Sequence, residues 1–88
     1  MREKINQEIS VISVFSARQR AAAPYLISWQ NSDYQVGKIG YHHTIRRGVT
    51  LHHIYEVTDK DGNLCFRLNH NTDNLHWVLE VIHDGLPN

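Results

Sequence analysis

The sequence predicts a mainly β protein, folded as a small antiparallel sheet or partly open barrel of five to six strands. Three observations predict this class. Apolar and polar residues alternate over several short stretches, as they do along strands with one buried face. Clusters of Asn, Asp, Gly and Ser separate these stretches at intervals of about ten to thirteen residues, which is typical of sequential hairpins. Finally, the strand registers derived separately for the last two hairpins place the large apolar side chains on the same face of the sheet.

Length and composition place the chain among small globular proteins. It has 88 residues, 41% of them hydrophobic, which fits one β-rich domain over residues 1–88 with a thin core. The single cysteine, Cys65, excludes an intrachain disulfide and fits a reducing compartment. No apolar stretch approaches the roughly 20 residues of a membrane span, and the start of the chain has no signal-peptide core. We therefore expect a cytoplasmic, bacterial-type protein with no membrane partner.

The first segment allows two interpretations. Ile5, Ile9 and Ile12 follow helical spacing, whereas the β-branched run over residues 9–15 favours a strand. We expect the strand, preceded by a loose N-terminus over residues 1–8.

The next segment contains the signals of a short helix. Residues 16–19 (Ser-Ala-Arg-Gln) match a capping box, and good helix formers follow until Pro24. So few residues form at most one or two helical turns, or else a loop.

Two further strands are expected over Tyr25–Trp29 and Tyr34–Ile39. Closing the polar turn between them as a hairpin places Trp29 opposite Tyr34 on a shared face. The alternation changes phase at Gly37, which predicts a bulge or sharp bend.

A three-stranded meander is expected at the C-terminal end. Its strands are Leu51–Val57, Leu64–His70 and Leu75–His83, joined by loops of four polar residues at 59–62 and 71–74. The two registers, derived separately, place the apolar residues in three rows on one face. These rows are Val57 with Leu64 and Val81, Tyr55 with Phe66 and Leu79, and His53 with Leu68 and Trp77.

Charge is unevenly distributed along a chain whose formal net charge is zero. Residues 1–48 carry seven Lys/Arg and three Asp/Glu, a balance of +4, while residues 49–88 carry two and six, a balance of −4. The polar stretch 42–48 is interpreted as the main exposed loop. A basic edge could contact a phosphate backbone, and the alternative is an ordinary mixed surface. This edge would comprise Arg18, Arg20, Lys38, Arg46 and Arg47. The expected contact residues for nucleic acid or another ligand are Lys38, Tyr41, His42, His43, Arg46 and Arg47.

Seven histidines suggest metal binding, but their spacing argues against it. Adjacent histidines on a strand point to opposite faces, so neither His42–His43 nor His52–His53 shares an ion easily. The predicted register places His52, Asn69 and His76 in one outer row, with the two histidines roughly 9–10 Å apart. A zinc ion there needs a third ligand, and no carboxylate matches this row. We therefore expect no metal site and no cofactor.

The remaining polar residues of the meander indicate no enzymatic activity. His53 falls on the core face, and we interpret it as a neutral histidine bonded to a backbone carbonyl or a tyrosine; the alternative is a polar group in an open barrel mouth. Cys65 falls on the outer face opposite Glu56 and Glu80, whose charges would raise the thiol pKa and make a poor nucleophile. No catalytic residue is identified.

Two aromatic motifs resemble those of a small bacterial family of unknown function. One is the Trp-x(4)-Tyr-x-Val hairpin at Trp29, Tyr34 and Val36; the other is a meander ending in Trp-x-Leu-x-x-Val. The second departs by one residue here, because Val81 comes two residues after Leu79. The resemblance covers residues 24–85. Relatives stand alone or are appended to proteins resembling Y-family translesion polymerases, which implies an accessory role near DNA metabolism and no catalytic residues.

Together these features predict a non-enzymatic binding or accessory module associated with nucleic acid. Two alternatives are a histidine-based metal-binding protein or hydrolase, and a protein-interaction domain that self-associates through a free edge strand.

Overall fold

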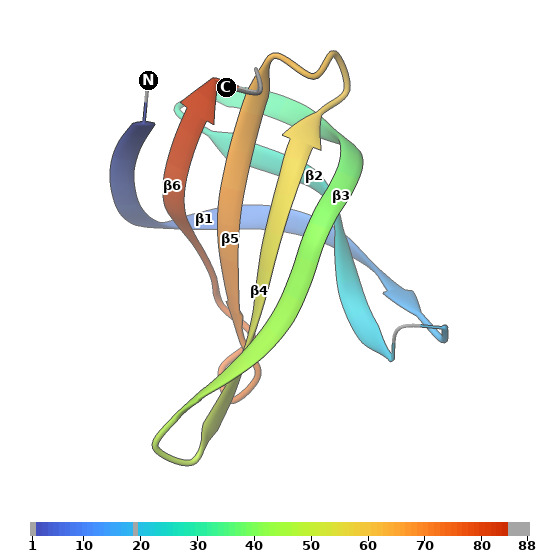
Figure 1. Cartoon of the computed structure of the whole chain (residues 1–88), viewed down its shortest axis with the longest axis vertical. Coiled ribbons are helices and arrows are strands. Elements are labelled where there is room, and N and C mark those ends of the chain that lie inside the picture. Colours follow the sequence, from blue (N-terminus) through green and yellow to red (C-terminus); the bar gives the residue numbers. More distant parts are fainter. Residues whose placement is uncertain (1, 19, 85–88) are drawn as a thin grey trace.

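Six antiparallel strands form a closed ring in this computed structural model, which describes residues 2–18 and 20–84. In chain order they are β1 (Arg2–Ser16), β2 (Ala21–Trp29), β3 (Ser32–Arg47), β4 (Thr50–Asp59), β5 (Leu64–Asn71) and β6 (Trp77–Asp84). Each strand pairs with the next, and β6 returns to pair with β1 (Figure 1). The predicted all-β antiparallel class and the C-terminal meander are confirmed. The described residues contain no helix long and apolar enough to cross a bilayer.

β1 is longer than the sequence suggests. The strand expected over residues 9–15 is present, but it begins at Arg2, so the prediction of a loose N-terminus is wrong for residues 2–8. These residues are ordered by pairing rather than by burial, because Arg2–Ile9 lie against β6 while Ser10–Ser16 pair with β2. One strand thus serves two neighbours and closes the ring.

Of the two alternatives after Ser16, the described residues show no helix. The Arg20 amide donates to the Ser16 carbonyl over 2.7 Å, and the chain enters β2 at Ala21. Ala21 and Pro24 are buried in that strand. Tertiary burial of two small residues therefore outweighs a weak local helix preference.

The β2–β3 hairpin has a tighter turn than predicted. Gln30 and Asn31 both have positive φ, 52° and 61°, which are the values of a two-residue hairpin turn. Trp29 consequently lies opposite Ser32, and Tyr34 lies opposite Ile27 rather than Trp29. The register differs by two residues, which leaves every side chain on its predicted face.

β3 contains the bulge predicted at Gly37 and continues through the predicted loop. Its register with β4 shifts at Gly37 and again at Gly40. A Cβ at Gly37 would lie 2.5 Å from the Asp59 carbonyl oxygen, so only glycine allows this approach. The prediction of an exposed loop over residues 42–48 is wrong, because β3 stays paired with β4 up to Arg47. This hairpin extends beyond the body at the bottom of Figure 1.

The meander keeps its predicted faces with a displaced register. Its loops are 60–63 and 72–75, each one residue further along than predicted, so the β4–β5 partners and the first β5–β6 partners move by two residues. Beyond residue 80 the β5–β6 partners move by three. An extra residue in β6, Glu80, adds a bulge after Leu79 and turns Ile82 rather than Val81 into the core. The observed rows are Val57 with Phe66 and Ile82, Tyr55 with Leu68 and Leu79, and His53 with His70 and Trp77.

Candidate functional site

The outer face of β4, β5 and β6 carries the largest group of interacting polar side chains in the described part of the chain. Two bulges meet there. β1 has an irregularity between Lys4 and Gln7, where Asn6 has a φ of 50°, and it lies beside the Glu80 bulge of β6. Bulges re-aim side chains and occur often beside functional sites. Here they turn Asn6 and Glu80 toward the same part of the surface.

A chain of polar contacts crosses this face from β4 to β6. Asn69, which is only 5% exposed, donates from Nδ2 to Glu80 Oε2 over 2.8 Å. Its Oδ1 must therefore accept, and His52 Nδ1 donates to it over 2.8 Å. Glu80 Oε1 also lies 3.2 Å from Arg67 Nε. The Asn69 amide thus fixes the protonated nitrogen of His52 and the position of the Glu80 carboxylate.

Two adjoining hollows lie over these contacts, with volumes of about 340 and 330 Å³. They share Asn6, Arg47 and Glu80, and we call them together the outer groove. The lining residues used below are Arg2, Lys4, Asn6, Glu8, Arg47, His52, Arg67, Asn69, His76 and Glu80.

The charges of the outer groove leave an excess of cations. Both carboxylates have partners: Glu80 contacts Arg67, and Glu8 Oε1 lies 3.2 Å from His76 Nδ1. Arg2, Lys4 and Arg47 are exposed and make no ion pair with any described carboxylate. The groove is therefore suited to an anion.

The predicted outer row is wrong in its register. His52 lies opposite Asn71, and Asn69 lies opposite Ile54 and Val78, so the hydrogen bond between His52 and Asn69 runs diagonally. His76 pairs with Glu8 on β1. The prediction that no carboxylate matches this row is wrong, since Glu80 and Glu8 both lie beside it, and the bulge that delivers Glu80 has no signal in the alternation.

The six residues expected to contact a ligand do not form one surface. They lie on β3, where alternation separates them, so His42 points into the barrel and stacks on Tyr55 with ring centroids 4.3 Å apart. Arg47 lines the outer groove. Tyr41 is 52% exposed and its ring lies 4.8 Å from that of His43. Lys38 and Arg46 are exposed elsewhere on the same strand.

Histidines fill one end of the barrel interior. His42 Nε2 and His53 Nδ1 share a hydrogen bond of 2.8 Å, and the His70 ring stacks on Trp77 at 4.1 Å. Burial lowers the pKa of His42, His53 and His70, and the neighbouring His53 lowers the pKa of the other two further. His53 is half-buried at this end of the barrel, and its partner is His42 rather than the expected carbonyl or tyrosine. Tyr55 donates instead to the Ala22 carbonyl, 2.8 Å away.

Cys65 lies on the outer face as predicted, with different neighbours. The displaced register places it opposite Thr58 and His83, while Glu80 lies further along β6. Burial raises the pKa of the Cys65 thiol, and the Glu56 charge raises it further. The predicted direction of the pKa shift is therefore confirmed, but burial is its main cause and one carboxylate contributes instead of two.

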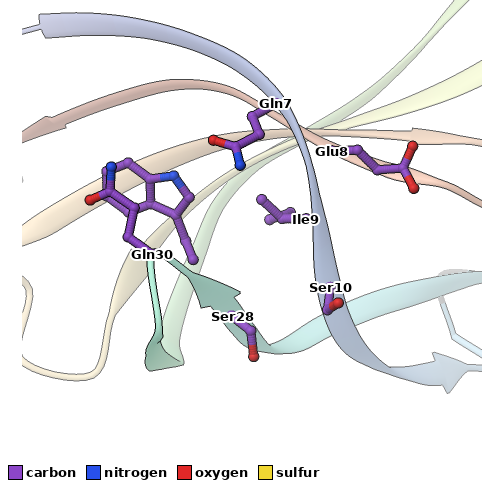
Figure 2. Close-up of a pocket in the computed structure, with 7 residues that line it drawn as sticks. Gln7, Glu8, Ile9, Ser10, Ser28 and Gln30 are labelled. Atoms are coloured by element: carbon purple, nitrogen blue, oxygen red, sulfur yellow. The ribbon is translucent and has the colours of Figure 1, made fainter.

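A third hollow, of about 270 Å³, lies where β1 passes the end of β2 (Figure 2). Gln7 and Glu8 both line it and point to opposite sides of β1 in this view, and Glu8 also contacts His76. Trp29 also lines it, and the indole Nε1 is buried without a hydrogen-bond partner among the described residues. The hollow is polar and shallow, and it holds no group of titratable side chains.

No family model, curated protein or solved structure matches this chain. The resemblance through Trp29, Tyr34 and Val36 therefore stays a prediction.

Proposed function

We propose that this protein is a non-enzymatic binding module whose outer groove takes the phosphate backbone of a single-stranded nucleic acid. The observation that carries the proposal is the set of three exposed cations, Arg2, Lys4 and Arg47, beside carboxylates that are already paired. Phosphate contacts supply most of the affinity of such modules, and lysine and arginine make them.

A second feature favours a single strand over a duplex. Tyr41, His43 and Arg47 alternate onto the same outer side of β3, and the Tyr41 ring is exposed beside His43. Unpaired bases stack on such rings with little sequence preference, whereas a duplex hides its base faces. Six residues of strand, about 20 Å, separate Tyr41 from Arg47. Arg47 would therefore hold a phosphate while a base a few nucleotides further along stacks on Tyr41.

Fluorescence anisotropy with a labelled single-stranded oligonucleotide tests this proposal. Three phosphate contacts give a slope of log affinity against log salt of about −2 for a single strand. The variant Arg2→Gln/Lys4→Gln/Arg47→Gln should lose most of the affinity and flatten this slope.

A matched control removes the same charge elsewhere. The variant Arg18→Gln/Arg20→Gln/Lys60→Gln neutralises three exposed cations outside the outer groove. It should keep most of the binding. Equal losses in both variants would mean that only net charge matters, and salt-independent binding would rule out phosphate contact.

A further inference from the structure

Three potential metal ligands come together on the outer face, on the three strands of the meander. Cys65 on β5 lies opposite His83 on β6 and close to Glu56 on β4. One sulfur, one ring nitrogen and one carboxylate oxygen lie within 4.8 Å of one another, and all three residues are half-buried. None of them takes part in the contacts between His52 and Glu80 described above.

The Glu80 bulge is what brings His83 to Cys65. Before the bulge the register pairs Leu68 with Leu79, and continuing it unchanged would place Ile82 opposite Cys65. The extra residue moves His83 into that position and keeps Ile82 in the core. The irregularity that shapes the outer groove therefore also assembles this group.

The His83 ring is oriented as metal-binding histidines usually are. Its Nδ1–H donates to the Asp84 carbonyl oxygen over 2.9 Å. The neutral ring then keeps a lone pair on Nε2, and a backbone carbonyl is a common partner of the non-ligating nitrogen at metal sites.

We propose that Glu56, Cys65 and His83 bind one divalent transition-metal ion of the zinc class. Sulfur, imidazole nitrogen and carboxylate oxygen together are ligands that Zn²⁺ accepts, and three protein ligands leave a fourth tetrahedral position for water. Ligand atoms around tetrahedral zinc lie about 3.3–3.7 Å apart, so atoms that now lie within 4.8 Å of one another approach by at most about 1.5 Å on binding. The thiol proton passes to solvent as the sulfur–metal bond forms, and thiolate plus carboxylate balance the two positive charges of the ion.

The surroundings favour the binding of a cation over a role of Cys65 as a nucleophile activated by His83. An activated nucleophile needs a neighbour that stabilises a free thiolate, whereas Glu56 opposes one. The same negative charge attracts a metal ion. His83 also borders a hollow of about 260 Å³ whose lining includes the carboxylates of Glu3 and Asp84.

Titration of the reduced full-length protein with Co²⁺ tests the site directly. Cobalt replaces zinc in such sites, and its bond to a thiolate gives a charge-transfer band in the near ultraviolet. We expect this band to saturate at one metal per chain and to disappear when Zn²⁺ is added. In Cys65→Ser the band should be absent, and in His83→Gln or Glu56→Gln the affinity should fall by about 10–100-fold or more.

His76→Gln is the matched control, because it removes an outer-face histidine outside this group. Its cobalt affinity should equal that of the parent protein, and circular dichroism of each variant verifies that the fold is kept. The proposal is overturned if saturating Co²⁺ gives no charge-transfer band. It is equally overturned if the band persists unchanged in His83→Gln and Glu56→Gln, or saturates at one metal per two chains, since the thiolate then binds without these partners.

Discussion

Replacing Trp77 by alanine should remove a large part of the stability of this domain. The side chain is 6% exposed, it belongs to the core cluster, and its ring lies parallel to His70 at 4.1 Å and tilted to Tyr55 at 5.8 Å. Truncation of a buried Trp costs about 3–5 kcal/mol, of which each aromatic contact accounts for roughly 0.5–1.5 kcal/mol. A domain of this size has a free energy of unfolding of about 4–13 kcal/mol, so the variant should be close to the limit of folding.

Urea denaturation followed by far-ultraviolet circular dichroism measures this cost without relying on Trp77 fluorescence. The midpoint should fall while the dependence on urea concentration stays the same, because the surface exposed on unfolding hardly changes. Val49→Ala is the control: Val49 is 90% exposed, and the change should be within about 0.5 kcal/mol. A loss below about 1 kcal/mol for Trp77→Ala would refute the placement of this residue in the core.

Three further predictions concern the histidines in the interior, the bulge at Gly37 in β3 and the hydrogen bonds of Asn69 on the outer face. Because burial lowers the pKa of His42 and His53, the unfolded chain takes up protons first as the pH falls below about 6.5. Stability is therefore fully present above that pH and should decline below it in urea titrations; a flat profile between about pH 7.5 and 5 would contradict this. Gly37→Ala should destabilise strongly, since the new Cβ would meet the backbone of β4, while Gly40→Ala, whose nearest contact would be 3.6 Å away, should cost much less; equal melting temperatures would argue against the bulge. Asn69→Ala leaves the partners of a buried amide unpaired and should cost about 1–3 kcal/mol in the same assay, and a neutral result would mean that the contacts are not formed in solution.

Most of the fold could be predicted from the alternation of apolar and polar residues, because this alternation specifies which side chains of a strand face the core. The β4–β5 register was displaced by two residues, yet Tyr55, Phe66 and Leu68 still lie in the core. A loop that moves by one residue changes the pairing by two and leaves the face unchanged. The sequence left a short helix and a loop open after Ser16. The helix did not form, because a local capping pattern over a few residues is weaker than strand pairing and the burial of neighbouring small residues.

The candidate sites were harder to predict because they depend on irregularities. Glu80 and Asn6 interrupt their strands without a glycine or proline to mark the position, unlike Gly37, whose bulge was predictable. Without the Glu80 bulge, neither the groove nor the meeting of Cys65 and His83 follows from the sequence. The predicted contact residues on β3 were scattered for the opposite reason, since a regular strand replaced the expected loop and alternation divided them.

The measurement that tests the outer groove most directly is a map of amide NMR shifts on addition of a short single-stranded oligonucleotide. We predict the largest shifts at Asn6, Arg47 and Glu80, where the two hollows meet, with smaller ones at Tyr41. These shifts should fade together as salt is raised. Shifts concentrated instead on the exposed apolar residues of the β1–β2 hairpin, Ile12–Phe15, would contradict the account and place binding on another face.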